Sequence, residues 1–442
     1  MNNKTKIIIG SGLSGPLLAI YLAQRKYSVK LYEKRPDMRQ TDISAGRSIN
    51  LALSHRGIRA LKAANVFDEI EPNLIPMKGR MIHHRNGELE FQAYSTNSHE
   101  YINSVSRGEL NNILMNHAEG TGNVEINFSH SLIKIDETNN ELVFNNGVRT
   151  SANNHIFGAD GAGSIVREYI DDKVSSPSFS EPLGHDYKEL HIAPGSDGDF
   201  QLEPNALHIW PRGEFMLIAL PNTDKSFTCT LFLPVEGKIS FSSLKTPESI
   251  NDFFQVYFED ILPFLENFSN TYFNNPTGKL ATVYATEWQY DNHYCLIGDA
   301  AHAVVPFFGQ GMNASFEDCQ IIMECLDASN GKWNNLFREY NVARKADADA
   351  IAKMAIENYV EMRDLVAQKE FIHEKKIANK LSERCPGRFI PRYNMVSFTS
   401  IPYSEVYKRG KIQKKIISKL DIENPDLKMA EIMIQQKLHP IK

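Results

Sequence analysis

The chain has 442 residues, which is too long for one simple hydrophobic core and indicates two or three subdomains. Its hydrophobic content of 42% and charged content of 23% are ordinary for a soluble globular protein, and a net charge of −6 argues against nucleic acid as a partner. No run approaches the roughly 20 apolar residues that a membrane helix needs. No signal peptide precedes the first apolar segment, so we expect a soluble, cytoplasmic protein without a membrane anchor.

Five cysteines are scattered along the chain. They form no CxxC pair and have no zinc-ligand spacing, so we expect no metal site. Cys295 and Cys319 lie in apolar patterns, which favours buried free thiols in a reducing compartment. A basic run at 408–415 is typical of a solvated helix face, which we favour over a lipid or nucleic-acid patch.

The first motif is a glycine-rich turn between apolar segments. The pattern predicts a strand, a helix and a second strand at 6–9, 16–25 and 28–32. In the turn, Gly10 permits a tight bend, Gly12 lets a pyrophosphate approach the backbone, and Gly15 brings the helix close to the sheet. Glu33 ends the second strand, where it would accept from ribose hydroxyls and repel a 2′-phosphate. The motif therefore favours FAD or NAD over NADP.

The following segments alternate between strand and helix patterns. They predict a strand at 46–54, a helix at 55–64, a hairpin at 77–91 around Asn86-Gly87, a helix at 108–117, and strands at 124–135 and 141–149. Arg107 directly precedes the helix at 108–117, a position that suits an anion. A surface ion pair is the alternative for this arginine.

A second strand end carries an Asp-Gly pair. Residues 154–164 lead through Asp160-Gly161 to a helix that starts at Ile165. The insert that follows, at about 176–287, is mostly strand-like and has turns at 212–213 and 221–224, which predicts an antiparallel sheet. Such a sheet would either wall a pocket or cap the cofactor domain.

A third strand end, at 294–299, delivers a carboxylate at Asp299. An apolar wall at 304–308 then leads to Gly309-Gln310-Gly311, and a helical pattern starts near Asn313. Taken alone, this stretch also fits a connection that needs its glycines only for a turn. Together with the first turn and Asp160, it predicts a site for a polar, partly anionic cofactor.

The predicted fold class is α/β: a Rossmann-like FAD-binding domain with an inserted antiparallel β-sheet substrate domain and a C-terminal helical region. Helical patterns dominate from Ser315 onward, at 316–326 and 333–365, before a mixed tail. We place the discontinuous cofactor domain at 1–73, 103–175 and 288–330, the sheet domain at 74–102 and 176–287, and the helical region at 331–442.

The three cofactor motifs, in this order, resemble the single-component flavin aromatic hydroxylases of the p-hydroxybenzoate hydroxylase fold. Longer blocks narrow the resemblance to the kynurenine 3-monooxygenase family, over about residues 6–404. These blocks are 46–57, 75–77, 80–83, 207–212, 225–232 and 296–313.

The resemblance implies FAD-dependent hydroxylation of L-kynurenine to 3-hydroxy-L-kynurenine with NADPH and O₂, through a flavin hydroperoxide. NADPH would be a transient reductant without its own Rossmann domain, in agreement with the single dinucleotide fold evident in the chain. Because the flavin carries the chemistry, no catalytic side chain is assigned. His302, in the loop after Asp299, is interpreted as structural.

The resemblance also places the cofactor and the substrate. With the motif residues Gly10, Gly12, Gly15 and Asp160, the FAD-contacting positions fall on Ser14, Glu33, Lys34, Arg35, Ala52, Arg107, Leu132, Asp299, Met312 and Asn313. The amino-acid end of the substrate would be held by Arg80, Tyr94, Asn358 and Tyr393, and the aromatic ring would lie against Ile218, Leu220, Phe232, Pro306 and Phe307. A surface tyrosine is the alternative for Tyr94, and a solvent-facing amide is the alternative for Asn358.

Two departures from the family pattern stand out. Ser315 occupies a position where relatives usually have glycine, which crowds the helix start. The chain ends in a polar, amphipathic segment, so the membrane-anchoring tail of eukaryotic members is not expected here. The alternatives are a hydroxylase of another aromatic amine or acid, a flavoprotein reductase and a non-catalytic FAD-binding regulator. The sequence does not decide between a monomer and a homodimer.

Overall fold

A computed structural model describes residues 5–40 and 50–441. It divides into two compact units. Unit 1 comprises the described residues of Met1–Leu74, Val105–Leu183 and Ala281–Ala352, and unit 2 comprises Ile75–Ser104, Gly184–Leu280 and Lys353–Lys442. The expected strand at 46–54 is described only from Asn50 onward, as β3 (Asn50–Leu53), and its Gly46-Arg47 opening lies outside the described residues.

Unit 1 is built on a six-stranded sheet. Its order is β18-β19-β12-β1-β2-β8, and all neighbours run parallel except β18 and β19. The strands are β1 (Thr5–Ile9), β2 (Ser28–Tyr32), β8 (Val124–Asn127), β12 (Ile156–Gly158), β18 (Gln289–Tyr290) and β19 (Tyr294–Leu296). The central strands are continuous apolar runs because parallel sheets bury both faces. The three strand ends singled out in the sequence therefore belong to adjacent strands, β19, β12 and β1.

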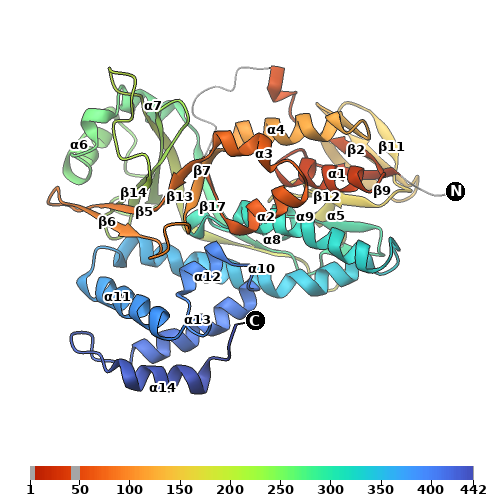
Figure 1. Ribbon diagram of the computed structural model, residues 1–442. Coiled ribbons are helices and arrows are strands. Elements are labelled where there is room, and N and C mark those ends of the chain that lie inside the picture. The colour runs from red at the N-terminus through yellow and green to blue at the C-terminus, as the bar shows by residue number, and fades with distance from the viewer. Residues whose placement is uncertain (1–4, 41–49, 442) are drawn as a thin grey trace. The chain divides into compact units, whose positions relative to one another are not determined.

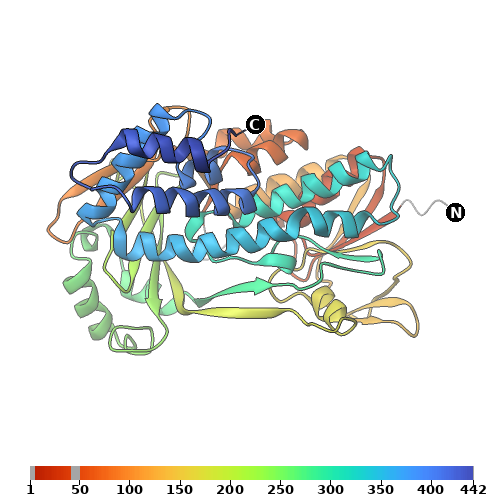
Figure 2. The same ribbon diagram turned by 90° about the horizontal axis from the view of Figure 1, so that it is seen from below.

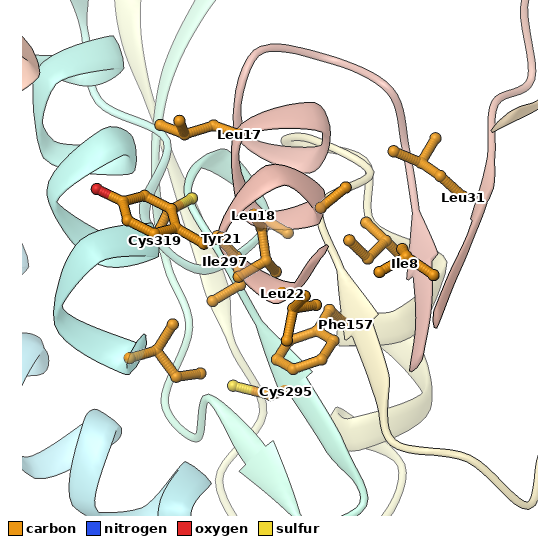
Figure 3. Packing of buried hydrophobic residues seen from close by; sticks show 14 of the residues in the cluster. Ile8, Leu17, Leu18, Tyr21, Leu22, Leu31, Phe157, Cys295, Ile297 and Cys319 are labelled. Carbon is orange, nitrogen blue, oxygen red and sulfur yellow. The ribbon is translucent and has the colours of Figure 1, made fainter. Parts of the chain in front are cut away.

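Helices surround this sheet, some of them on its faces and others, such as α2 on α9, on neighbouring helices (Figure 1). They are α1 (Ser14–Gln24), α2 (His55–Ala63), α3 (Phe67–Ile70), α4 (Arg107–Gly120), α5 (Ile165–Asp171), α8 (Asp299–His302) and α9 (Gly311–Ala328). In the core, Leu18 and Leu22 of α1 lie near Ile8 and Phe157 of the sheet (Figure 3). The predicted strand–turn–helix–strand start of the chain is confirmed within about two residues.

The buried thiols expected at Cys295 and Cys319 are confirmed. Both side chains are inaccessible to solvent and unpaired with another cysteine, and both lie in this core (Figure 3). The Cys319 thiol donates to the backbone oxygen of Ser14 at 3.4 Å, so it links α9 to the start of α1. Burial raises the pKa of both thiols well above the ordinary value.

The segment at 124–151 differs from its prediction. It forms four short strands instead of two, and only β8 joins the main sheet. The other three, β9 (Leu132–Asp136), β10 (Glu141–Phe144) and β11 (Arg149–Ser151), form a small antiparallel sheet of their own. Periodicity alone does not reveal which sheet a strand joins.

Unit 2 contains a seven-stranded sheet in the order β17-β13-β16-β15-β14-β5-β6. Its strands are β5 (Gly79–His83), β6 (Leu89–Ala93), β13 (Phe179–Ile192), β14 (Ala206–Pro211), β15 (Met216–Pro221), β16 (Phe227–Pro234) and β17 (Thr277–Tyr284). The short β4 (Ile75–Met77) and β7 (Ile102–Ser106) pair antiparallel. The hairpin predicted around Asn86-Gly87 is confirmed as β5–β6. One difference from the expected antiparallel sheet is that β5 and β14 run parallel.

Two helices cover one face of this sheet, and the sequence interpretation missed both. They are α6 (Pro247–Tyr257) and α7 (Phe268–Asn274), inside the insert interpreted as mostly strand. Thr246 and Ser249 form a capping box at the start of α6, a local signal that marks the helix in retrospect. Phe253 and Phe254 of α6 join a core with Trp210, Leu217 and other inward-facing strand residues.

The C-terminal part is helical, as expected. Helix α10 (Leu336–Val360) runs into a π-helical turn at Glu361–Leu365, and α11 (Lys369–Arg384), α12 (Arg392–Phe398), α13 (Tyr403–Ile417) and α14 (Leu427–Lys437) follow. Helices α11, α13 and α14 lie side by side around a small apolar core (Figure 2). Within the described residues, no helix combines the length and the apolar character needed to cross a membrane.

Candidate cofactor and substrate sites

The glycine-rich turn of unit 1 lies where β1 ends beside β12. Gly10 has φ +103°, a conformation that favours glycine, and a Cβ there would overlap the backbone of Ala159 and lie 2.8 Å from Asp160 Cα. A Cβ on Gly15 would overlap the Gly10 carbonyl, so α1 approaches the turn closely. By contrast, a Cβ on Gly12 would meet no atom within 4 Å. The turn is closely packed at Gly10 and Gly15 and open at Gly12, where we expected the pyrophosphate of a cofactor to approach the protein backbone.

Glu33, at the end of β2, points back to this turn. Its Oε2 accepts the Ser11 backbone N–H at 2.7 Å, and its Oε1 accepts Arg35 Nε at 2.8 Å. Burial raises the pKa of the Glu33 carboxyl, but the Arg35 guanidinium outweighs burial and holds that pKa below its usual value. The carboxylate therefore stays ionised and can accept from hydroxyl groups next to the turn.

Asp160 has a local partner that the sequence interpretation did not foresee. Its Oδ2 accepts the backbone N–H of Ile165 at 2.9 Å, so it caps α5 together with Ser164, whose Oγ accepts the Arg167 N–H at 2.9 Å. Its Oδ1 is buried without a hydrogen-bond partner among the described residues, and burial raises the pKa of the carboxyl. One oxygen serves the helix and the other is available to a ligand.

Asp299 opens the short helix α8, and its side chain is exposed. It follows Gly298, whose φ of +62° turns the chain out of the sheet. Ahead of α9, the Asn313 amide accepts the Ser54 backbone N–H at 2.9 Å and donates to the Gly309 oxygen at 2.7 Å. The Asn313 side chain thus binds the protein itself, which leaves the backbone N–H groups of the first turn of α9 for an anion or a flavin edge.

The other expected FAD positions are spread over unit 1. Lys34 is exposed after β2, Arg107 begins α4, and Leu132 is buried at the start of β9. Ser14, Arg35, Ala52 and Met312 are each only partly exposed. The crowding expected from Ser315 is relieved because its hydroxyl donates to the Gly311 oxygen within α9 at 2.8 Å.

Two buried polar atoms show that unit 1 fits a polar cofactor at the turn. Ser11 Oγ and Asn111 Oδ1 have no hydrogen-bond partner in the described part of the chain, although the Asn111 amide donates to the Ser11 oxygen at 3.2 Å. Buried polar atoms are rarely left unpaired. With the open space at Gly12 and the ionised Glu33, they suit the pyrophosphate and ribose of FAD. Asn111 was not expected from the sequence.

A buried cationic cluster in unit 2 contains three of the four residues expected at the amino-acid end of a substrate: Arg80, Tyr94 and Tyr393. Tyr94 and Tyr393 stack with ring centroids 4.8 Å apart, and the Arg80 guanidinium lies 5.2 Å from the Tyr393 ring. Asn358, on α10, is 1% exposed and Tyr94 is 8% exposed, so neither is the surface residue that the alternatives described. Arg80 is 2% exposed, and its Nε has no hydrogen-bond partner among the described residues.

Two charged residues of this cluster were missed. Arg80 Nη1 donates to Glu361 Oε1 at 3.0 Å, and Lys375 of α11 interacts electrostatically with both groups. Burial raises the pKa of Glu361, but Arg80 and Lys375 outweigh burial and lower it. Burial together with the nearby Arg80 lowers the pKa of Lys375 to about 8. A pairing between positions 80 and 361 has no signal in a single sequence.

The sheet register places the expected ring-contacting residues of unit 2 on the face that carries Arg80. Ile82, two residues from Arg80, pairs across the sheet with Ile209, which pairs with Ile218. Side chains of paired residues share a face, and positions two apart on a strand do too. Ile218, Leu220 and Phe232 therefore lie on the face of Arg80, opposite the face that packs on α6. The other two expected residues, Pro306 and Phe307, belong to unit 1, where Phe307 is buried and Pro306 exposed.

His302, interpreted from the sequence as structural, is buried inside unit 1. It is 3% exposed, its Nε2 donates to Asp318 Oδ2 at 2.5 Å, and its ring stacks on Trp288. In the part of the chain that the structure describes, no group of three or more His, Cys, Asp or Glu residues is arranged to hold a metal ion.

Comparisons with solved structures agree with this architecture. A tetrameric form of 2-methyl-3-hydroxypyridine-5-carboxylic acid oxygenase matches with a TM-score of 0.68 at 18% identity, covering 84% of this chain and 94% of that chain. PqsL of Pseudomonas aeruginosa, in complex with 2-aminobenzoylacetate, matches with a TM-score of 0.62 at 18% identity, covering 82% and 97%. At these identities the likeness shows the fold alone.

Sequence comparisons are more specific. The FAD binding domain family matches residues 4–184 and 270–355. Kynurenine 3-monooxygenase of Myxococcus xanthus is 43% identical over 99% of this chain and 96% of its own length. The enzymes of that name from Cytophaga hutchinsonii and Dictyostelium discoideum are 44% and 42% identical, covering 96% and 99% of this chain and 95% and 99% of their own lengths.

The dinucleotide fold and its glycine turn, together with the family model that matches more than half of the chain, define an FAD-binding protein. Within that class, the identity over nearly the whole chain is decisive. The chain belongs to the kynurenine 3-monooxygenase family.

Proposed function

We propose that this chain is a cytoplasmic monooxygenase that hydroxylates L-kynurenine to 3-hydroxy-L-kynurenine, with bound FAD, NADPH as transient reductant and O₂. The observation that carries the proposal is the identity of more than 40% over nearly the full length of curated kynurenine 3-monooxygenases. The buried arginine and tyrosine cluster of unit 2 supports it, because kynurenine offers a carboxylate to such a cluster.

The substrate end of the proposal rests on charge. Arg80 presents a planar fork of donors that matches a carboxylate, and Tyr94, Tyr393 and Asn358 add directed hydrogen bonds. Burial makes each of these bonds stronger than it would be in water. The aromatic ring would extend along the apolar sheet face that carries Ile218, Leu220 and Phe232, and we retain Pro306 and Phe307 as further ring contacts.

The cofactor end rests on the residues of unit 1. Gly10, Gly12 and Gly15 would receive the pyrophosphate, Glu33 the ribose, and Asp299 the ribityl region, with the first turn of α9 near the flavin ring. Bound FAD would supply the redox chemistry, which is acceptance of a hydride from NADPH and activation of O₂ for transfer of one oxygen atom. The chain itself would bind and orient the substrate and exclude water from the site. The buried side chains of Val305, Phe307 and Phe308 suit that last task.

Orientation is the main requirement for the aromatic substrate. The aniline nitrogen of kynurenine makes its ortho carbon electron-rich, so holding that carbon at the reacting position supplies most of what the step needs. No general base is assigned among the described residues. The clamp at the amino-acid end and the apolar face at the ring end would fix the substrate at both ends.

Product identification tests the reaction. FAD-loaded enzyme with NADPH, kynurenine and ¹⁸O₂ should yield 3-hydroxykynurenine that carries one labelled oxygen atom. NADPH oxidation stimulated by another aromatic amine or acid, and not by kynurenine, would keep the enzyme class and reject the substrate. Reduction of a substrate without label incorporation would reject hydroxylation altogether, and FAD binding without NADPH-driven reduction would indicate a regulator.

A substitution tests the clamp. Arg80→Met should raise the KM for kynurenine on the order of 100-fold, because a charge-assisted hydrogen bond contributes about 1.5–3 kcal/mol. The FAD content should stay unchanged. Arg85→Met is the matched control, since Arg85 is exposed beside the Asn86-Gly87 turn of the same hairpin. An unchanged KM in Arg80→Met, with normal folding, would reject the carboxylate assignment.

A further inference from the structure

Five ionisable side chains gather in the interior of unit 1, around α9. Arg56 comes from α2, His302 from α8, Glu317 and Asp318 from α9, and Arg344 from α10. Figure 1 labels these helices. None of the five side chains is more than 4% exposed. Glu317 accepts from Arg56 at 2.7 Å and from Arg344 at 2.8 Å, and Asp318 accepts from Arg344 at 2.8 Å. Neither the FAD contacts nor the substrate clamp includes any of these groups.

Stability alone does not account for such a cluster. Desolvating paired charges costs about as much as their attraction returns, and apolar side chains of similar volume often serve the fold as well. A buried ionic group has a different explanation when it fixes the position of another segment of the chain. The contacts of Asp318 identify this segment.

Asp318 binds both ends of α8. Its Oδ2 accepts the backbone N–H of Gly298, just before α8, at 3.1 Å, and the ring of His302, at the end of α8, at 2.5 Å. Its Oδ1 accepts Arg344 Nε at 2.8 Å, so the carboxylate itself is held from the other side. Burial raises the pKa of Asp318, but His302 and Arg344 outweigh burial and lower it, so the acceptor stays ionised.

The held segment has little freedom of its own. It is only four residues long, and Gly298 adopts φ +62°, where a Cβ would lie 2.8 Å from the hydroxyls of Ser14 and Ser315. The N–H of Ala301 and that of His302 both donate to the Gly298 oxygen, at 2.8 and 3.0 Å. Asp299 is the first residue of this segment, so the direction of its exposed carboxylate depends on how α8 is fixed.

We propose that Asp318, held by Arg344, is a positioning residue for the cofactor: through Gly298 and His302 it fixes α8 so that Asp299 presents its carboxylate to FAD. The inference rests on FAD binding as part of the proposed function. It assigns to the Asp318–His302 pair the role of holding α8 in place, so that Asp299 can contact FAD. Glu317 serves the same cluster differently. Its partners among the described residues are Arg56, Arg59 and Arg344, and none of them lies in α8.

This difference supplies a matched pair of variants. Asp318→Asn and Glu317→Gln each remove one buried negative charge from α9, and both leave Arg344 underpaired. Only Asp318→Asn weakens the hold on α8, because a neutral amide oxygen is a poorer acceptor than a carboxylate for the Gly298 N–H and the His302 ring. The dissociation constant of FAD, measured on apoprotein by quenching of flavin fluorescence, should rise at least 10-fold in Asp318→Asn and stay within about 3-fold of wild type in Glu317→Gln. The thermal midpoint of the apoprotein should fall in both. An equal loss of FAD affinity in the two variants would overturn the proposal, because it would show a merely structural cluster.

Substitutions at His302 keep the test decisive if Asp318→Asn does not fold. His302→Gln retains an N–H donor that reaches Asp318, whereas His302→Ala removes it. Retained FAD affinity in His302→Gln and loss in His302→Ala support the proposal, and equal affinity in the two variants contradicts it. The flavin absorption spectrum of each loaded variant should shift only where α8 is released. Wild-type protein that binds FAD but does not hydroxylate kynurenine would reject the substrate and leave this inference standing, whereas wild-type protein that binds no FAD would reject both.

Discussion

At the scale of single residues, Arg80 and Glu361 form a buried ion pair in unit 2. A buried arginine needs a counter-charge, and Glu361 provides it at 3.0 Å with its own side chain 18% exposed. Glu361→Gln should lower the free energy of unfolding by about 3 kcal/mol, because it leaves Arg80 buried and unneutralised. Kynurenine should restore stability to this variant more than to wild type, since its carboxylate replaces the lost charge. Urea unfolding of FAD-loaded protein with and without kynurenine measures both effects.

Asp364→Asn is the control for that measurement. Asp364 lies in the same π-helical turn but pairs with its neighbour Arg363 at 2.6 Å near the surface, so its loss should change stability by about 0.5 kcal/mol or less. Wild-type stability in Glu361→Gln, or an equal gain from kynurenine in wild type and variant, would show that Glu361 is not the counter-charge of Arg80.

At the scale of elements, two glycines of the β1–α1 turn should have different roles: Gly10 in folding and Gly12 in cofactor binding. Gly10→Ala should destabilise the apoprotein by about 3 kcal/mol, because a side chain at φ +103° is strained and would overlap the Ala159 backbone. Gly12→Ala should leave apoprotein stability within about 0.5 kcal/mol, since a Cβ there meets no atom within 4 Å. It should nevertheless weaken FAD binding at least 10-fold by filling the space that the pyrophosphate approaches. Thermal unfolding of the apoprotein and FAD titration separate the two effects, and unimpaired FAD binding by Gly12→Ala would remove Gly12 from the site.

Elements also mark how far the sequence alone could predict this fold and its sites. The β1–α1–β2 start and the β5–β6 hairpin were predicted because glycine turns and apolar periodicity are local signals. Helix α6 was missed although Thr246 and Ser249 cap it, because aromatic residues such as Phe253 and Phe254 fit a strand as well as a helix.

The candidate sites divide in the same way. The residues of the glycine turn and Glu33 follow from local patterns, whereas Arg80, Tyr94, Asn358 and Tyr393 came from family resemblance, and their roles stay predictions. The Arg80–Glu361 and Asp318–His302 pairs could not be predicted, because tertiary packing brings their charges together across the sequence. Buried counter-charges are visible only once burial is known.

At the scale of the whole molecule, buried thiols should make the protein sensitive to alkali. Burial raises the pKa of Cys229, and also that of Cys295 and Cys319, so these thiols keep their protons in the folded protein above pH 9 while the unfolded chain releases them. The folded state then binds more protons than the unfolded state, and the free energy of unfolding falls as pH rises. Lys6 and Lys375, whose pKa values burial lowers to about 8, act in the opposite direction up to about pH 10.5. Lys188, and Arg212 with a pKa lowered to about 10, act in the same direction as these lysines. The pKa values of Cys325 and Cys385 are raised as well, so the five thiols outnumber these four basic groups. Buried tyrosines such as Tyr340, whose pKa burial also raises, add to the thiols above pH 10.

Cys229→Ala isolates one thiol of this balance. Burial is the sole cause of the raised pKa of Cys229, so its removal should change the pH dependence without disturbing a charge pair. The cavity left by the sulfur should lower stability by the same amount at every pH. The fall in the free energy of unfolding above pH 9 should become shallower by up to about 1.4 kcal/mol per pH unit, the effect of one proton. Urea unfolding of FAD-saturated protein at pH 8, 9 and 10 gives both slopes. Parallel slopes in variant and wild type would show that Cys229 ionises as readily in the folded protein as in the unfolded chain.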